Sequence, residues 1–174
     1  MKPFSSQTEL SAPSSSTPAL AIFGLAATRG PADRVLHELK VAGYPNTVLS
    51  ILFLDYPLQG MDASSQFALP SNEIRGVVAW IADARAIKTT KHSLIAAGPV
   101  ADSIDRASPG SVAEALRLLG VRDADASLYE ERVLKNEFLI AVHVDSEAGA
   151  ASAREVMEGA GAEEISQCQT VAST

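Results

Sequence analysis

A pattern of strand, polar turn, helix, glycine and strand occurs twice in this chain, once near each end. The first copy runs from Ala19 to Leu54 and the second from Phe138 to Gln169. In each copy an apolar run precedes an amphipathic helix of about three turns, which a glycine ends before the second strand begins. Two such βαβ units are typical of a ferredoxin-like sandwich, a four-stranded antiparallel sheet with two helices on one face.

The fold class that we predict is therefore α+β, with a long and mostly helical insertion between the two halves of the sheet. The first unit occupies residues 19–55, the insertion 56–136 and the second unit 137–170, together forming a single domain. Residues 1–18, rich in Ser, Thr and Pro, are predicted to be a disordered leader. The alternative is an open α/β sheet with parallel neighbours, but a third equal repeat is missing from the sequence.

The insertion is divided by glycines and prolines into shorter segments with helical spacing of apolar residues. Helices are predicted at residues 72–87, 111–119 and 126–135, with a shorter helical or irregular piece at 93–104. The strands VLSILFL and LIAVHV barely alternate, so both of their faces look apolar. The sheet face that the two repeated helices leave open therefore needs a cover, either a second copy of the chain or the insertion.

The composition argues against several classes of protein. Of the 174 residues, 47% are hydrophobic and 20% charged, which is ordinary for a globular chain. A net charge of −7 without a dense basic cluster argues against a nucleic-acid partner. The single cysteine, Cys168, excludes an internal disulfide and a multi-cysteine metal site, and it fits a reducing cytoplasm. No apolar run approaches the roughly 20 residues that span a bilayer, and the run at 19–27 is predicted to be a core strand.

Several short blocks are similar, in their order and spacing, to those of a known family. They are the opening AIFG strand, LKVAGYPNTVLSILF, LIAAGPV at Leu94–Val100, LYEERV at Leu128–Val133, LIAVHVD, and GAEEIS at Gly161–Ser166. In these blocks the chain resembles small bacterial general stress proteins, including those described as low-temperature-induced. The resemblance covers nearly all of residues 19–168 and implies a stress-associated domain without a defined molecular activity.

The chain departs from that family in its centre. The family members carry a long apolar region rich in Gly and Ala, which resembles a glycine zipper and implies close helix packing or an approach to a membrane. Here the central glycines are interspersed with charged residues, among them Asp83, Arg85 and Lys88. This departure argues against a membrane contact.

His143 and Tyr129 are the candidate site residues near the second repeat. If the strand alternates, His143 shares a face with Ala141 and Asp145, where it could act as a base or a metal ligand. The simpler interpretation is a strand histidine on a solvated or interface face. The neighbouring Glu130 and Glu131 diverge by about 100° on a helix, so a solvated face is a better interpretation than paired catalytic carboxylates.

The most apolar part of the insertion contains Val77, Trp80 and Ile81 at the spacing of one helical face. These side chains are predicted either to line an interface or ligand site, or to cover the sheet or a small core of the insertion itself. The sequence contains neither a phosphate-binding glycine motif nor a GxSxG elbow. We therefore predict no catalytic, cofactor-binding or metal site.

The leading functional hypothesis is a non-enzymatic, cytoplasmic, stress-associated domain that acts through self-association, as a dimer, or through protein partners. It follows from the apolar strands and from the resemblance. Two alternatives remain open: a small-molecule-binding regulatory domain with its ligand between sheet and insertion, and an enzyme that uses His143.

Overall fold

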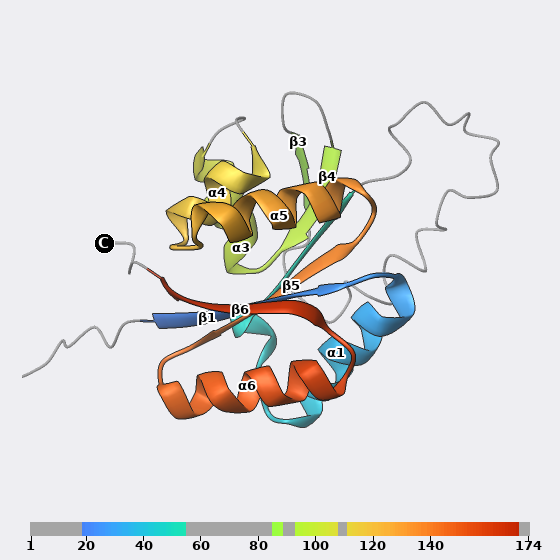
Figure 1. Ribbon diagram of the computed structural model, residues 1–174, viewed down its shortest axis with the longest axis vertical. Coiled ribbons are helices and arrows are strands. Elements are labelled where there is room, and N and C mark those ends of the chain that lie inside the picture. Colours follow the sequence, from blue (N-terminus) through green and yellow to red (C-terminus); the bar gives the residue numbers. More distant parts are fainter. Residues whose placement is uncertain (1–18, 55–84, 89–92, 108–110, 171–174) are drawn as a thin grey trace, which may run out of the picture.

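The computed structural model describes residues 19–54, 85–88, 93–107 and 111–170, which form an α+β fold (Figure 1). The elements in chain order are β1 (Ala19–Ala26), α1 (Arg29–Val41), the 3-10 turn η2 (Asn46–Val48), β2 (Leu49–Leu54), β3 (Arg85–Lys88), β4 (Ser93–Ala97), α3 (Pro99–Ala107), α4 (Val112–Leu118), α5 (Asp123–Leu134), β5 (Phe138–Val144), α6 (Glu147–Gly159) and β6 (Glu163–Thr170). Both predicted βαβ units are present. The predicted leader, residues 1–18, lies outside the described residues.

The described strands form one six-stranded sheet in the order β3-β4-β2-β5-β1-β6. Every neighbouring pair in it is antiparallel. The α+β prediction is thus confirmed, whereas the parallel alternative is wrong for this sheet. The predicted number of four strands is also wrong, because β3 and β4 from the insertion extend the sheet beyond β2. The four strands of the two repeats remain together as β2-β5-β1-β6.

The insertion contains strands that the sequence analysis missed. The helix predicted at 72–87 lies mostly outside the described residues, but its last residues belong to β3. The piece at 93–104 is strand β4 followed by helix α3, with Gly98 between them. Backbone pairing of Ile87 with Leu94 joins β3 to β4. A short apolar run does not distinguish a buried strand from a buried helix, since both lack polar residues on every side.

Helices cover both faces of the sheet. Helices α1 and α6 lie on one face and α3, α4 and α5 on the other (Figure 1). All six residues of β2 are buried, because its side chains alternate between two apolar cores. Leu52 and Leu54 pack on the side of α3–α5, while Leu49, Ile51 and Phe53 pack on the side of α1 and α6.

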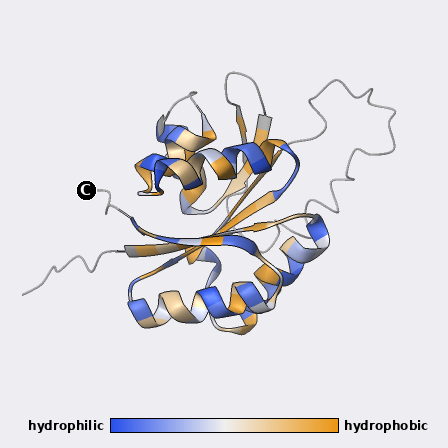
Figure 2. Cartoon of the chain, in the orientation of Figure 1, coloured by the Kyte–Doolittle hydropathy of each residue, from blue (hydrophilic) through white to orange (hydrophobic). Residues whose placement is uncertain are grey.

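Figure 2 shows the hydrophobic strands enclosed between these two helical layers. The weak alternation seen in the sequence is therefore explained within one chain. Of the two covers that we considered for the open face, the structure supplies the insertion, through α3, α4 and α5.

The turn from β4 into α3 depends on Gly98. Its φ is +82°, in the left-handed region that favours glycine. A Cβ atom on this residue would overlap the carbonyl oxygen of Leu49 and lie 2.7 Å from the Ser50 Oγ. The close approach lets β2 accept the first turn of α3, where the Val100 N–H donates to the Ser50 Oγ at 3.2 Å.

We expect Gly98→Ala to lower the free energy of unfolding by at least about 2 kcal/mol, because backbone strain and steric overlap act together. Urea denaturation followed by circular dichroism measures the loss. The matched control is Gly30→Ala, since a Cβ at Gly30 meets no atom within 4 Å. This control should change stability by less than about 1 kcal/mol. Equal midpoints for the two variants would contradict the assignment.

Candidate functional site

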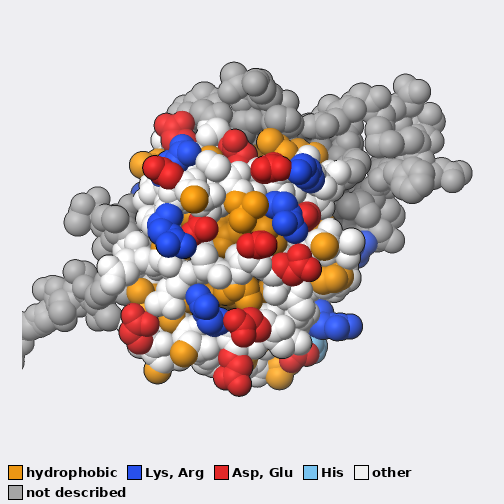
Figure 3. All heavy atoms as spheres, viewed as in Figure 1, with side chains coloured by type: hydrophobic (Ala, Val, Ile, Leu, Met, Phe, Trp, Pro, Cys, Tyr) orange, Lys and Arg blue, Asp and Glu red, His pale blue; other side chains and the backbone are white. Residues whose placement is uncertain are grey.

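Strand β6 forms one edge of the described sheet, with β1 as its neighbour. Within β6, Glu163, Glu164, Gln167 and Gln169 are exposed. Figure 3 shows the side of the molecule on which β6 lies. Hydrophobic side chains lie at its centre, on both sides of the pale band of backbone where Figure 1 places β6. An edge strand presents backbone N–H and C=O groups on its outer side, so it is a site where another strand can pair.

A β-bulge interrupts the start of β6. Phe23 pairs with Ser166 and Leu25 pairs with Glu163, so β6 takes three steps where β1 takes two. The extra residue brings Glu164 to a φ of 50°, which is uncommon outside glycine. From Ser166 to Thr170 the pairing with β1 is regular. The bulge therefore separates an irregular acidic start from a regular uncharged remainder.

Tyr129 of α5 holds this bulge from the core. The side chain is only 1% exposed, and its ring stacks on Phe23 with the ring centroids 6.0 Å apart. Its hydroxyl donates to the Glu164 carbonyl oxygen at 2.7 Å and lies 2.6 Å from the Ser166 Oγ. Burial raises the pKa of Tyr129 to about 12, so the hydroxyl keeps its proton at neutral pH. The structure thus places this candidate residue inside the core.

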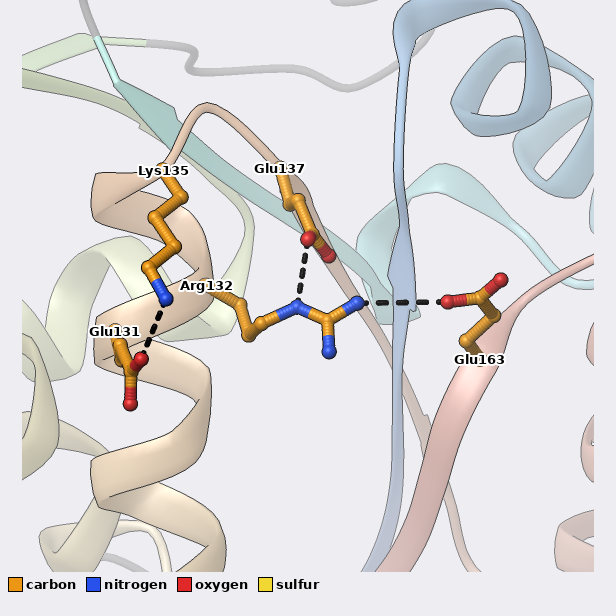
Figure 4. A network of polar contacts seen from close by, with 5 residues as sticks. All are labelled: Glu131, Arg132, Lys135, Glu137 and Glu163. Atoms are coloured by element: carbon orange, nitrogen blue, oxygen red, sulfur yellow. Dashed lines mark hydrogen bonds and ion pairs between the residues drawn. The ribbon is translucent and has the colours of Figure 1, made fainter.

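An ion-pair network joins α5 to the same end of the sheet (Figure 4). The Arg132 Nε lies 2.6 Å from a carboxylate oxygen of Glu137, and its Nη2 lies 3.4 Å from a carboxylate oxygen of Glu163. The hydrogen bond to Glu137 raises the pKa of the Arg132 guanidinium, so its charge is permanent. Because Glu137 precedes β5 and Glu163 begins β6, the network fixes α5 over two strands and offsets one carboxylate of the edge.

The adjacent carboxylates of α5 do different things. Glu130 accepts a hydrogen bond from the Ala113 N–H at 2.9 Å, in the first turn of α4. Glu131 is exposed and pairs with Lys135, whose hydrogen bond lowers the pKa of the Glu131 carboxyl. The two side chains diverge, as helix geometry predicts, and they form no acid–base pair with each other.

His143 lies on the face covered by α3–α5, the face that it shares with Ala141 as alternation predicts. Its Nε2 is 3.4 Å from the Oγ of Ser50, a buried residue that the sequence analysis did not single out. The same Oγ accepts the Val100 N–H. Burial lowers the pKa of His143 to about 4, so the imidazole is neutral at pH 7.

The neutral imidazole can accept a hydrogen bond from the Ser50 hydroxyl. Together with the Val100 N–H, this contact forms a polar link between β2, β5 and α3. Ser50 is 1% exposed and lies directly beneath the Gly98 turn, a position that a substrate cannot reach without displacing α3. The hypotheses of a His143 enzyme and of a ligand between sheet and insertion stay predictions.

Cys168 is half-buried on β6, and its thiol lies 3.8 Å from the Leu119 carbonyl oxygen, to which it donates. Burial raises the pKa of the Cys168 thiol to about 11, so the reactive thiolate is scarce at neutral pH. The remaining candidate residues, Val77, Trp80 and Ile81, lie outside the described residues.

Two features are absent from the described part of the chain, a cluster of metal-binding side chains and a membrane-spanning helix. Within it, no group of three or more His, Cys, Asp or Glu side chains is arranged to hold a metal ion. None of its helices has the length and apolar character required to cross a membrane. In comparisons with known proteins, no family model, curated protein or solved structure matches this chain.

We expect Tyr129→Phe to lower the free energy of unfolding by about 1–2 kcal/mol, because the Glu164 carbonyl oxygen loses its buried donor. Ser166→Ala should cost less, since the Tyr129 hydroxyl still reaches that carbonyl oxygen. Urea denaturation of both variants checks the order. If Tyr129→Phe proves as stable as the unsubstituted chain, the bulge is held by other contacts.

The neutral state of His143 makes stability depend on pH. Its pKa is lowered from 6.5 to about 4 by folding, so the contribution is complete above pH 6.5 and is lost as pH falls toward 4. The loss amounts to at most about 3 kcal/mol. Chemical denaturation at pH 7 and at pH 4 measures this loss. Between these two pH values the free energy of unfolding should decrease less in His143→Gln than in the unsubstituted chain. A matched variant at an exposed histidine, His37→Gln, should keep the His143-dependent decrease; identical pH profiles for both variants would refute this role.

Proposed function

We propose that this chain is a non-enzymatic, stress-associated domain that acts through self-association. The proposed stress association rests on the sequence blocks in which the chain resembles bacterial general stress proteins. The self-association rests on one structural observation, the exposed position of β6. The cytoplasm is the proposed location, supported by the lone Cys168.

The argument for an edge interface follows from the layers. Both faces of the sheet carry helices of the same chain, so a second copy is not needed to cover a face. The two ends of the described sheet differ in length: β3 has four residues and β6 has eight. A long edge strand offers more backbone groups for pairing than a short one. Self-association is therefore proposed at the β6 end of the sheet.

We further propose that β2, β5, β1 and β6, with α1 and α6, constitute a ferredoxin-like core. Its support is the spatial order of these four strands and the packing of both helices on one face. In this interpretation the insertion adds two strands beyond β2 and a second helical layer. The added strands cover the β2 edge of this core and leave its other edge, β6, exposed.

Light scattering coupled to size-exclusion chromatography tests the proposed self-association. We expect a species of twice the chain mass of 18.2 kDa at high micromolar concentration, with dissociation on dilution. The association should persist in 0.5 M salt, about the level at which surface charges are screened beyond a few ångströms, because backbone pairing does not depend on ion pairs. A monomer throughout this concentration range would overturn the proposal.

A further inference from the structure

The charges of β6 are divided unevenly along its length. Its first two residues, Glu163 and Glu164, are acidic, and the following residues from Ile165 to Thr170 are uncharged. The bulge lies at the acidic start, whereas the uncharged part pairs regularly with β1. Bulges and charges are both features that prevent pairing at an edge. They protect the first residues of β6, whereas the remainder carries neither feature.

The pairing geometry of two identical strands limits how two copies can meet. In an antiparallel pair, residues directly opposite point to the same face of the sheet. Two copies related by a two-fold axis normal to the sheet must therefore pair one residue of β6 with its own copy, and the axis passes midway between these two residues. An axis at Gln167 places Ser166 opposite Cys168 of the second copy and Ile165 opposite Gln169.

This register also separates the carboxylates. Glu164 comes to lie opposite Thr170 of the second copy, so each acidic start faces an uncharged end. A parallel arrangement of the two strands would instead bring Glu163 and Glu164 beside the same residues of the second copy, and like charges directly opposite are destabilising. Arg132 already offsets the Glu163 carboxylate within each chain.

We propose that the partner of β6 is a second copy of this chain, paired antiparallel about a two-fold axis at Gln167. This inference rests on the proposed self-association. The two sheets then continue into each other through backbone hydrogen bonds. The charge pattern favours a second copy as the partner, because β6 can pair with itself in the antiparallel direction without placing carboxylates opposite each other. The Gln167 side chain, which donates to the Glu147 carboxylate at 3.1 Å, lies next to the axis.

Disulfide trapping tests the register. In a Cys168→Ser background, Gln167→Cys places two thiols opposite each other at the axis, about 5 Å apart at their Cβ atoms. Mild oxidation should convert this variant to a covalent dimer. The matched control is Gln169→Cys in the same background, another exposed glutamine of the same strand. In the proposed register its two copies are separated by four strand residues, about 13 Å, which is beyond the reach of a disulfide.

We expect the Gln167→Cys variant to cross-link at least tenfold faster than the Gln169→Cys variant. Equal rates, or faster cross-linking of Gln169→Cys, would overturn the register. A second variant, Gln167→Glu, tests the same site without oxidation, since it places two carboxylates at the axis and beside Glu147. Light scattering should show its dimer dissociating at a concentration at least tenfold higher, while circular dichroism confirms an unchanged fold.

The outcomes separate this inference from the proposed function. A wild-type monomer overturns both. A dimer that survives Gln167→Glu and does not cross-link at residue 167 keeps the proposed self-association and overturns the β6 interface.

Discussion

Strands β1, β2 and β5 are apolar on both of their faces, and this property determines how the rest of the chain is arranged. A strand of this kind is stable in water only between two covering layers, because each exposed apolar side chain costs about 1.5–3 kcal/mol relative to burial. The repeated helices α1 and α6 provide one layer. The second layer must come from another part of the chain or from another molecule, and the insertion provides it with α3, α4 and α5.

The edge of the sheet follows a different rule from its centre. In β6 the exposed and half-buried side chains are mixed, and polar residues return at Gln167 and Gln169. Tyr129 and Arg132 reach this strand from α5, one through a buried hydroxyl and the other through a charged group. Helix α5 therefore both covers the sheet and sets the shape of its edge. The same helix connects the core of the protein with the edge at which we propose self-association.

The local parts of this fold could be predicted from the sequence, whereas the long-range parts could not. Both βαβ units follow from hydrophobic periodicity and from glycines at the ends of helices, and the face of His143 follows from alternation alone. Strand β3 could not be recognised, because Ile87 continues the apolar spacing of the residues before it and its pairing with Leu94 is invisible in the sequence. The bulge at Glu164 was missed for a related reason. It exists only through the register of β6 against β1 and the hydroxyl of Tyr129, a residue 35 positions away.

The hydrogen bond from the Ala113 N–H to Glu130 makes the first turn of α4 dependent on a side chain of α5. The Ser111 side chain caps the same turn by accepting a hydrogen bond from the Glu114 N–H. One cap of α4 therefore comes from the residue that precedes it and the other from α5. With seven residues, α4 is too short to be stable alone. The two helices are therefore expected to form and open as one cooperative unit, and local unfolding of this unit would uncover the part of the sheet on which they pack, while α3 would still cover Ser50.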